Sequence, residues 1–543
     1  MEGLPKWRQN EAQSITLFLV LLKPLCSQTV DMTPLFISTA LLLPLRSLAQ
    51  QASSSWRKPN ITTSRDDRVS VAEAAIEKAL VFIDATNGQF SDPGDSYGLG
   101  GTLYSQLAEF DLATNQTKYA DVLQRYFLAA GESLGQYEVV NFTGDYFGII
   151  SPQLCVSGGS GFNTVHRNYG HAAALAYTTY KIPAFLQYAE QVWWAVNSYT
   201  LSQKEVDAGT LLLKSFALKS TCSGITMAGG TFRPFGRREI TTTPDMNAAA
   251  TGGFLVLSAL LAEATHNIMY LSAAKASADF LQAHLLNVQN VVQDTISGRA
   301  NDSCALLQKT VEASYNSGIM IEGLAILYSI TGNTSLYDQI GKMVTAGIPY
   351  SGWQSQNGII ANGATKSGDM FFVRALATVN ARNAATPALQ SYISAYLAVQ
   401  FNAVIDLATT KGSNIYANSW VGPPSLSFAP GNQTNAIQVL IGAINSDNVT
   451  TPSTAPSGSV PSPSASNFSP LSPPPPHKSS SHVGTIVGGT LGGLALLGIL
   501  VGILLWRRCR AQQDRDMAIQ QPHSPEAPRI NPFDLGYRLM ADL

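Results

Sequence analysis

The sequence predicts an all-α protein, a closed ring of helical hairpins of the (α/α)6 toroid type. The first observation is a unit at residues 314–336, in which a polar start precedes about three turns of almost purely apolar helix, a pattern typical of buried helices. The second is that this unit recurs along the chain. The third is the count of roughly six hairpins, which suits inner helices wrapped by outer ones, with an open helical array as the alternative.

The unit at residues 314–336 shows each signal of an αα-hairpin. Residues 315–318 (YNSG) are turn-prone, and Glu322 is the one charge in the apolar run that follows. Residues 331–333 (TGN) stop the helix. A second, more polar helix then begins near Tyr337 and ends before Pro349. We therefore expect one buried helix, a short turn and one outer helix.

Similar units follow one another along the chain, separated by long loops. Each places an aromatic residue just after its turn. The units are expected at residues 100–134, 170–196, 252–285 and 367–405, with single helices at 69–84 and 433–444. The aromatic residues are Tyr119, Phe185, Tyr270 and Tyr337.

Composition excludes some classes of function. The chain has 543 residues and a net charge of −2, so nothing indicates nucleic-acid binding. Only 13% of residues are charged while small polar residues are plentiful, which is common in secreted, glycosylated proteins. No Cys/His spacing resembles a zinc site, and no Asp-rich loop favours calcium. The sequence therefore predicts no metal and no cofactor.

Residues 1–49 read as a leader. From Met32 a short apolar core runs to Ser47-Leu48-Ala49, which satisfies the small-x-small cleavage rule, so residues 32–49 are predicted to be a signal peptide. Residues 1–31 are either a mis-called extension, the favoured alternative, or the first part of a long leader. Neither piece belongs to the predicted ectodomain at residues 66–446.

Eight N-x-Ser/Thr acceptors favour passage through the secretory pathway. All lie between the predicted leader and the predicted membrane segment. They are Asn60, Asn115, Asn141, Asn301, Asn333, Asn432, Asn448 and Asn467.

The C-terminal part predicts a membrane anchor. Residues 450–482 form a Ser/Pro-rich stalk, and residues 483–506 are 24 uncharged residues, long enough to span a bilayer. Arg507, Arg508 and Arg510 follow, which places the tail 507–543 in the cytosol. We expect a single-pass plasma-membrane protein with its helical domain outside the cell.

Three cysteines fall outside the leader and the membrane edge, so they cannot all pair within one chain. Cys222 and Cys304 both lie in loops that join hairpins, and we expect a disulfide between them. Cys155 is then left free or buried.

Polar and aromatic residues near the starts of the inner helices are candidates for a sugar-binding groove. Aromatic faces stack on sugar rings, and amides bond their hydroxyls. The alternative is that these aromatic residues cover helix ends as hydrophobic lids. The candidates are Tyr315, Asn316, Trp353 and Trp420.

Several stretches together resemble glycoside hydrolase family 76, the endo-α-1,6-mannanase-like proteins, over roughly residues 69–444. The layout of leader, helical domain, stalk and membrane helix looks like the membrane-anchored fungal members of that family. The stretches are Tyr315–Gly318 leading into IMIEGLAIL, Ser220–Cys222 through Ala228–Gly230, Tyr396–Ile405 and Trp420–Pro424.

The resemblance implies the (α/α)6 fold and a chemistry that needs two carboxylates. The family's pair resembles adjacent aspartates at the start of an inner helix, followed closely by Trp and Gly. The corresponding residues 166–180 contain no aspartate, and Asn168 and Tyr169 stand where the pair is expected. An amide cannot act as a carboxylate nucleophile, and a phenol with a pKa near 10 is a poor acid. We assign Asn168 and Tyr169 to substrate binding.

Other carboxylates are candidate catalysts. Asp145 follows a loop aromatic cluster, Glu322 lies on a predicted buried helix, and Asp369 starts another inner helix. An unpaired Glu322 would have a raised pKa, which suits a general acid. The alternative for Glu322 is a buried carboxylate satisfied by hydrogen-bond donors. His166 and His171 flank the altered site, where they either bond a sugar or cap the helix.

Three functions remain open from the sequence. The first is a glycoside hydrolase or transglycosidase acting on α-mannan-type wall polysaccharide. The second is an inactive glycan-binding pseudoenzyme on the same fold. The third is a structural surface glycoprotein. The expected partners are a polysaccharide and the membrane, and no nucleic acid.

Overall fold

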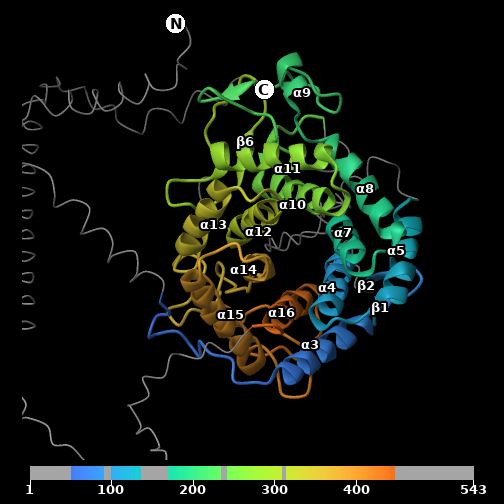
Figure 1. Ribbon diagram of the computed structural model, residues 1–543, viewed down its shortest axis with the longest axis vertical. Coiled ribbons are helices and arrows are strands. Elements are labelled where there is room, and N and C mark those ends of the chain that lie inside the picture. Colours follow the sequence, from blue (N-terminus) through green and yellow to red (C-terminus); the bar gives the residue numbers. More distant parts are fainter. Residues whose placement is uncertain (1–50, 91–98, 136–168, 234–240, 308–312, 447–543) are drawn as a thin grey trace, which may run out of the picture. The chain divides into compact units, whose positions relative to one another are not determined.

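The computed structural model describes residues 51–90, 99–135, 169–233, 241–307 and 313–446. Within these ranges six inner helices form a closed cycle, in which each helix packs against the next and α16 packs back against α4 (Figure 1). This cycle is the ring that the sequence predicts, not an open array. The inner helices are α4 (Leu99–Thr114), α7 (Tyr169–Tyr180), α10 (Ala248–Thr265), α12 (Ser314–Thr331), α14 (Met370–Ala381) and α16 (Pro430–Ala443).

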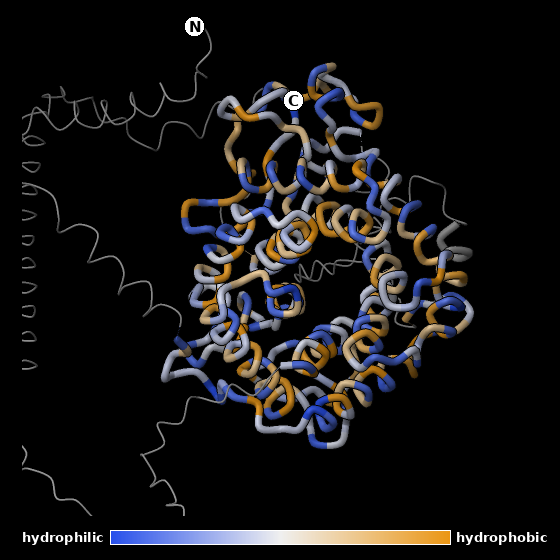
Figure 2. Tube along the Cα trace, in the orientation of Figure 1, coloured by the Kyte–Doolittle hydropathy of each residue, from blue (hydrophilic) through white to orange (hydrophobic). Residues whose placement is uncertain are grey.

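An outer layer of helices covers the inner ring, and hydrophobic residues recur along both layers (Figure 2). The outer helix α13 shows why: Ile340, Met343, Val344 and Gly347 are buried, a spacing that places them on one face. The outer helices are α3 (Arg65–Leu80), α5 (Ala120–Gly135), α8 (Pro183–Asn197), α11 (Ile268–Phe280), which continues into the π-helical turn η2 (Leu281–Leu285), α13 (Thr334–Gly347) and α15 (Pro387–Leu407). A short helix α9 (Gln203–Ala208) follows α8.

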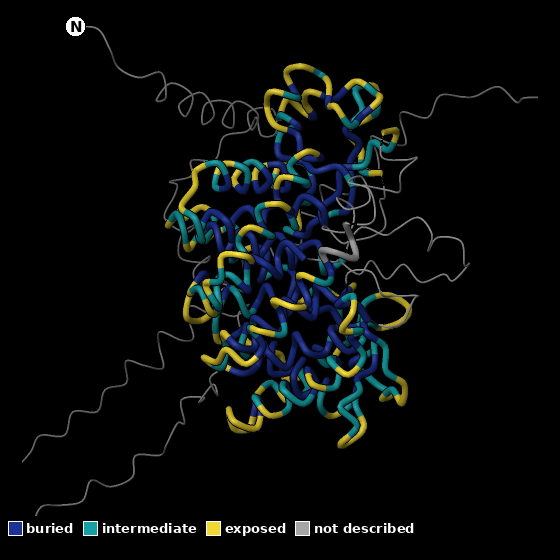
Figure 3. Tube along the Cα trace, turned by 90° about the vertical axis from the view of Figure 1, so that its right-hand side faces the viewer, coloured by how far each residue is buried: buried dark blue, intermediate teal, exposed yellow. Residues whose placement is uncertain are grey.

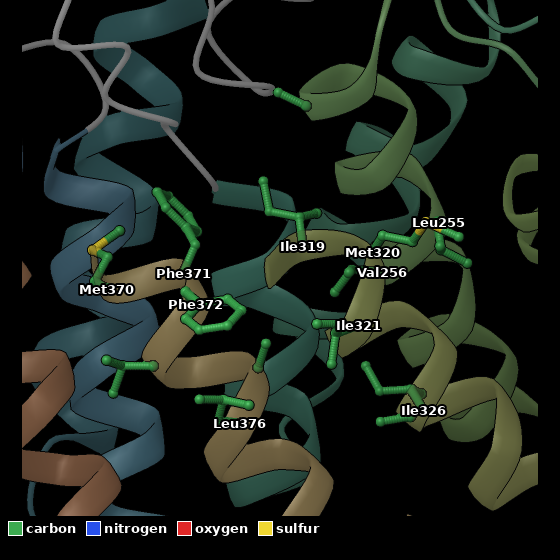
Figure 4. Packing of buried hydrophobic residues seen from close by; sticks show 14 of the residues in the cluster. Leu255, Val256, Ile319, Met320, Ile321, Ile326, Met370, Phe371, Phe372 and Leu376 are labelled. Atoms are coloured by element: carbon green, nitrogen blue, oxygen red, sulfur yellow. The ribbon is translucent and has the colours of Figure 1, made fainter. Parts of the chain in front are cut away.

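The inner helices pack closely because glycines stand at their contacts. A Cβ on Gly318 of α12 would lie 2.7 Å from the backbone nitrogen of Phe372 on α14. A Cβ on Gly323 of α12 would lie 2.4 Å from the side chain of Leu255 on α10. Figure 4 shows the apolar side chains that fill these contacts. Buried residues fill the middle of the ring wall, and exposed ones lie mainly in its turns and loops (Figure 3).

All inner helices begin at the same end of the ring, which we call the mouth. A Cβ on Gly101, near the start of α4, would lie 3.0 Å from the backbone nitrogen of Tyr169, the first residue of α7. At the other side of the ring the first N–H of α14, from Met370, donates to Asn435 Oδ1 near the start of α16 at 2.7 Å. The first turns of these inner helices therefore meet around the mouth.

Short antiparallel strand pairs lie in the connecting segments. In β5 and β6, Met246 is opposite Ile296, and this pairing joins the start of α10 to the segment before α12. The pairs are β1 (Ile83–Asp84) with β2 (Gln89–Phe90), β3 (Thr221–Cys222) with β4 (Ile225–Thr226), and β5 (Asp245–Asn247) with β6 (Thr295–Ser297).

The structure joins Cys222 and Cys304 in the expected disulfide, with their Cα atoms 5.6 Å apart. The bond ties β3 to a loop 82 residues further along the chain. Cys222 lies in the connection between α8 and α10, and Cys304 lies in the connection between β6 and α12, so both are outside the inner helices. The bond therefore constrains a loop region and not the ring wall.

Replacing both cysteines by alanine is expected to lower the free energy of unfolding by about 2–5 kcal/mol, because a long loop is then released in the unfolded chain. Thermal unfolding of the purified variant measures the loss, and reductant added to the unsubstituted protein should reproduce it. Equal melting temperatures for the two proteins would contradict the expectation.

Some sequence predictions fall outside the described residues: the leader, the stalk, the membrane segment, the tail, Asp145, Asn168 and Cys155. Within the described ranges one helix, α10, is long and apolar enough to cross a membrane, and it is mostly buried in the ring. Of the predicted glycosylation sites, Asn432 is half-buried in the first turn of α16. The exposed ones are Asn60, Asn115, Asn301 and Asn333, and those outside the described ranges are Asn141, Asn448 and Asn467.

Candidate active site

Tyr169 lies at the mouth as the first residue of α7, and it is buried. Its hydroxyl donates to Gln89 Oε1 at 2.7 Å, and its ring meets Tyr104 edge-on with centroids 5.5 Å apart. The phenol therefore links the start of α7 to the segment before α4. This is an anchoring contact at the helix start where the family resemblance places its catalytic pair.

Asp369 is the N-cap of α14. Its Oδ1 accepts the backbone N–H groups of Phe371 at 2.9 Å and Phe372 at 3.1 Å, and its Oδ2 accepts the hydroxyl of Ser314. Burial raises the pKa of Asp369, and these donors oppose the rise. Asp369 was a candidate catalyst from the sequence, but both of its oxygens are occupied, one by helix capping and the other by Ser314 at the start of α12.

Tyr315 and Asn316 lie in the first turn of α12. Tyr315 is half-buried, whereas Asn316 is buried and donates from Nδ2 to Asp294 Oδ1 at 3.1 Å. Asn316 Oδ1 has no hydrogen-bond partner among the described residues. Asp294 directly precedes β6 and was not singled out from the sequence. The pair fixes the loop before α12 to the helix that it leads into.

Trp353 and Trp420 belong to the core and do not offer open faces. Trp353 packs against Tyr350 and Phe372, with centroids 4.7 and 5.6 Å away, and is 2% exposed. Trp420 is fully buried against Gly368. Both tryptophans therefore act as hydrophobic lids in the described structure. This is the alternative to sugar stacking that the sequence left open.

Glu322 forms a buried ion pair inside the ring. Its Oε2 accepts from Arg374 Nε at 3.0 Å and Nη2 at 2.9 Å, and its Oε1 lies 3.2 Å from His171 Nε2. Three inner helices, α7, α12 and α14, supply these side chains. Since a carboxylate only accepts, the imidazole donates its Nε2–H to Glu322.

This pairing overturns the expectation of a raised pKa at Glu322. Burial alone raises the pKa of Glu322, but the Arg374 guanidinium and His171 outweigh burial and lower it to about 2. Burial, assisted by the nearby Arg374 charge, lowers the pKa of His171, so its ring is neutral. Glu322 is therefore a permanent anion and not a general acid, and His171 is a buried partner of Glu322.

Glu109 on α4 is the second interior carboxyl group. Its Oε2 accepts from Gln438 Nε2 at 2.5 Å, and its Oε1 is shut off from solvent without a partner among the described residues. Burial raises the pKa of Glu109 to about 7, opposed by Arg374 and Gln438 and assisted by the negative charge of Glu322. Glu109 can therefore exist as a neutral acid near neutral pH.

Arg374 and Glu109 were not predicted from the sequence as site residues. One signal was available for Arg374: Glu322 and Arg374 are each the lone charge in an otherwise apolar inner helix. Two isolated opposite charges on buried helices are expected to pair, because an unpaired buried charge is very costly. No comparable signal marked Glu109, whose helix also carries Asp111.

No group of three or more His, Cys, Asp or Glu side chains suited to a metal ion occurs in the described ranges. Among the carboxyl groups enclosed in these ranges, Glu322 is held as an anion and Glu109 can hold a proton. At the mouth, Asn247 caps the start of α10 and Asp369 caps the start of α14.

Comparison with known proteins agrees with this architecture. Residues 240–455 match the sequence model of glycosyl hydrolase family 76. A search of curated proteins finds no match.

Solved structures share the fold. An inactive variant of the alpha-1,6-mannanase of Salegentibacter sp. HEL1_6 in complex with alpha-1,6-mannotriose aligns with a TM-score of 0.54 at 15% identity, over 70% of this chain and 99% of that one. The unsubstituted enzyme aligns with the same score and identity, over 69% and 99%. Dfg5 from Chaetomium thermophilum in complex with glucosamine aligns with a TM-score of 0.51 at 16% identity, over 72% and 92%. The resemblance to glycoside hydrolase family 76 is thereby confirmed, by the sequence of residues 240–455 and by a shared fold.

Proposed function

We propose that the protein is a cell-surface glycoside hydrolase or transglycosidase that acts on α-mannan-type wall polysaccharide. The family 76 match over residues 240–455 carries this proposal. It is supported by the fold shared with a mannanase that binds alpha-1,6-mannotriose. The signal-peptide pattern at residues 32–49 and the apolar segment at 483–506 support the cell-surface assignment.

A specific observation favours a second candidate, a glycan-binding pseudoenzyme. Asn168 and Tyr169 stand where the family resemblance places two aspartates. The described candidates do not replace them readily, since Glu322 is held by Arg374 and Asp369 caps α14. The wall polymer would then be held without being cut.

The test is to secrete residues 51–448 and incubate them with α-1,6-mannan. New reducing ends or transfer products support the enzyme, whereas binding without turnover supports the pseudoenzyme. If neither turnover nor binding is seen, both proposals are wrong, and a structural glycoprotein remains. If turnover is seen, Asp145→Asn should abolish it and Asp121→Asn, on the outer helix α5, should not. If only binding is seen, Asn168→Asp is the variant expected to restore turnover.

A further inference from the structure

The contact between α4 and α16 is where the chain closes its ring, because these are the first and the last inner helices. Gln106 Nε2 donates to the carbonyl of Thr434 at 2.7 Å and to Gln438 Oε1 at 3.3 Å. Gln438 Nε2 then donates to Glu109 Oε2 at 2.5 Å. We call these four residues the closing seam.

A permanent charge ties the end of α16 to the outer helix α3. Arg68 on α3 donates to the carbonyl of Ile444 from Nε at 3.3 Å and from Nη2 at 3.0 Å, and to Ser446 at 3.1 Å. An arginine stays protonated across the whole physiological range. A change of pH therefore acts on the closing seam and not on this outer contact.

Glu109 is the one titratable member of the closing seam. Among the described residues, the charged or titratable groups that act on it are Glu322 from α12 and Arg374 from α14, with His171 of α7 bonded to Glu322. Helix α16 contains no titratable side chain. On α3, the nearby carboxylates Glu73 and Glu77 pair instead with Lys118 beside the α4–α5 turn.

We propose that the closing seam is a proton-operated clasp, closed when Glu109 is protonated and loosened when Glu109 loses its proton. The protonated carboxyl group carries no net charge in this half-buried position. The ionised group has one oxygen bonded to Gln438 and one buried oxygen without a partner among the described residues, and the loss of hydration disfavours its charge more than Arg374 and Gln438 together favour it. An unsatisfied buried charge is costly, so the ionised side chain is driven toward water and releases Gln438.

The direction of the effect follows from linkage. The pKa of Glu109 is raised in the folded protein, so the folded state binds this proton more tightly than the unfolded chain. The contribution of Glu109 to stability is fully present below its ordinary value of 4.5 and is lost as the pH rises toward about 7. The clasp therefore holds in acidic surroundings and loosens above neutrality. This inference goes beyond the proposed function and does not depend on it.

Amide hydrogen exchange of the full chain tests the clasp. After correction for intrinsic rates, peptides from α16 are expected to exchange roughly tenfold faster at about pH 8 than at about pH 6. Glu109→Gln should abolish this difference, because an amide mimics the protonated acid. Glu73→Gln, the matched control on α3, should keep it. A pH response that survives Glu109→Gln, or that the unsubstituted protein lacks, overturns the proposal.

A second variant keeps the test decisive if Glu109→Gln does not fold. Gln438→Leu removes the donor that favours ionised Glu109, so the midpoint of the pH response is expected to move to higher pH. An unchanged midpoint in Gln438→Leu would also overturn the clasp, whatever the result with mannan.

Discussion

Replacing Arg374 by leucine is expected to lower the free energy of unfolding by about 3–5 kcal/mol, because Glu322 is then left as a buried charge without its counter-ion. Arg374 holds Glu322 through two hydrogen bonds of 3.0 and 2.9 Å, and both side chains are buried. His171 is neutral and supplies one hydrogen bond, which does not compensate the charge. Urea denaturation of the purified protein measures the loss.

Two further variants separate ion pairing from general disruption. Adding Glu322→Leu to Arg374→Leu removes the orphaned charge, and the double variant is expected to recover most of the loss. Arg382→Leu breaks the more exposed bond to Glu263, at 2.6 Å, and is expected to cost less than about 1 kcal/mol. If Arg374→Leu and Arg382→Leu cost the same, the buried pair is not a principal support of the ring.

The loss should also depend on pH in a defined direction. Since the folded-state pKa of Glu322 is lowered, its contribution is present above its ordinary value of 4.5 and is lost as the pH falls toward about 2. The difference in stability between the unsubstituted protein and Arg374→Leu should therefore shrink as the pH falls, because Glu322 takes up a proton first in the variant and in the unsubstituted protein only near about pH 2. A difference that stays constant in acid would contradict the assignment of charge to Glu322.

The ring was predictable because the deciding signals are local. In α12 the apolar run, the stop at residues 331–333 and the following polar helix lie within one stretch, and the structure ends that helix at Thr331. The same pattern located the other hairpins. Such periodicity mainly decides whether a helix is a buried inner one or a more polar outer one. The closure of the ring depends instead on the contact between α4 and α16, which are far apart in the sequence.

The chemistry of the site was less predictable because it depends on contacts between distant residues. Glu322 lies 52 residues from Arg374 and 151 residues from His171 in sequence, and these partners reverse the direction of its pKa shift. The sequence likewise did not decide how the aromatic side chains of the loops are oriented. Composition does not show whether a tryptophan turns its face outward or into the core.

Trp420→Ala tests that last distinction, and it is expected to cost about 3–5 kcal/mol of unfolding free energy. The indole is fully buried, and a Cβ on Gly368 would lie 2.0 Å from its Cε2 atom. Gly368→Ala alone is expected to destabilise the protein by about 1–3 kcal/mol, because the added methyl group overpacks the contact.

The two changes should not add. Trp420→Ala empties the space that the Gly368→Ala methyl group needs, so the double variant should be no less stable than Trp420→Ala, with a coupling energy of at least about 1 kcal/mol. Denaturation curves of the four proteins give this coupling directly. If Trp420 were instead a sugar-stacking platform, Trp420→Ala would keep its stability and lose mannan binding. A variant that stays stable but no longer binds mannan would show that Trp420 belongs to a sugar-binding groove. A side chain that fills the core cannot be removed without leaving a cavity, so a variant that lost such a side chain could not keep its stability.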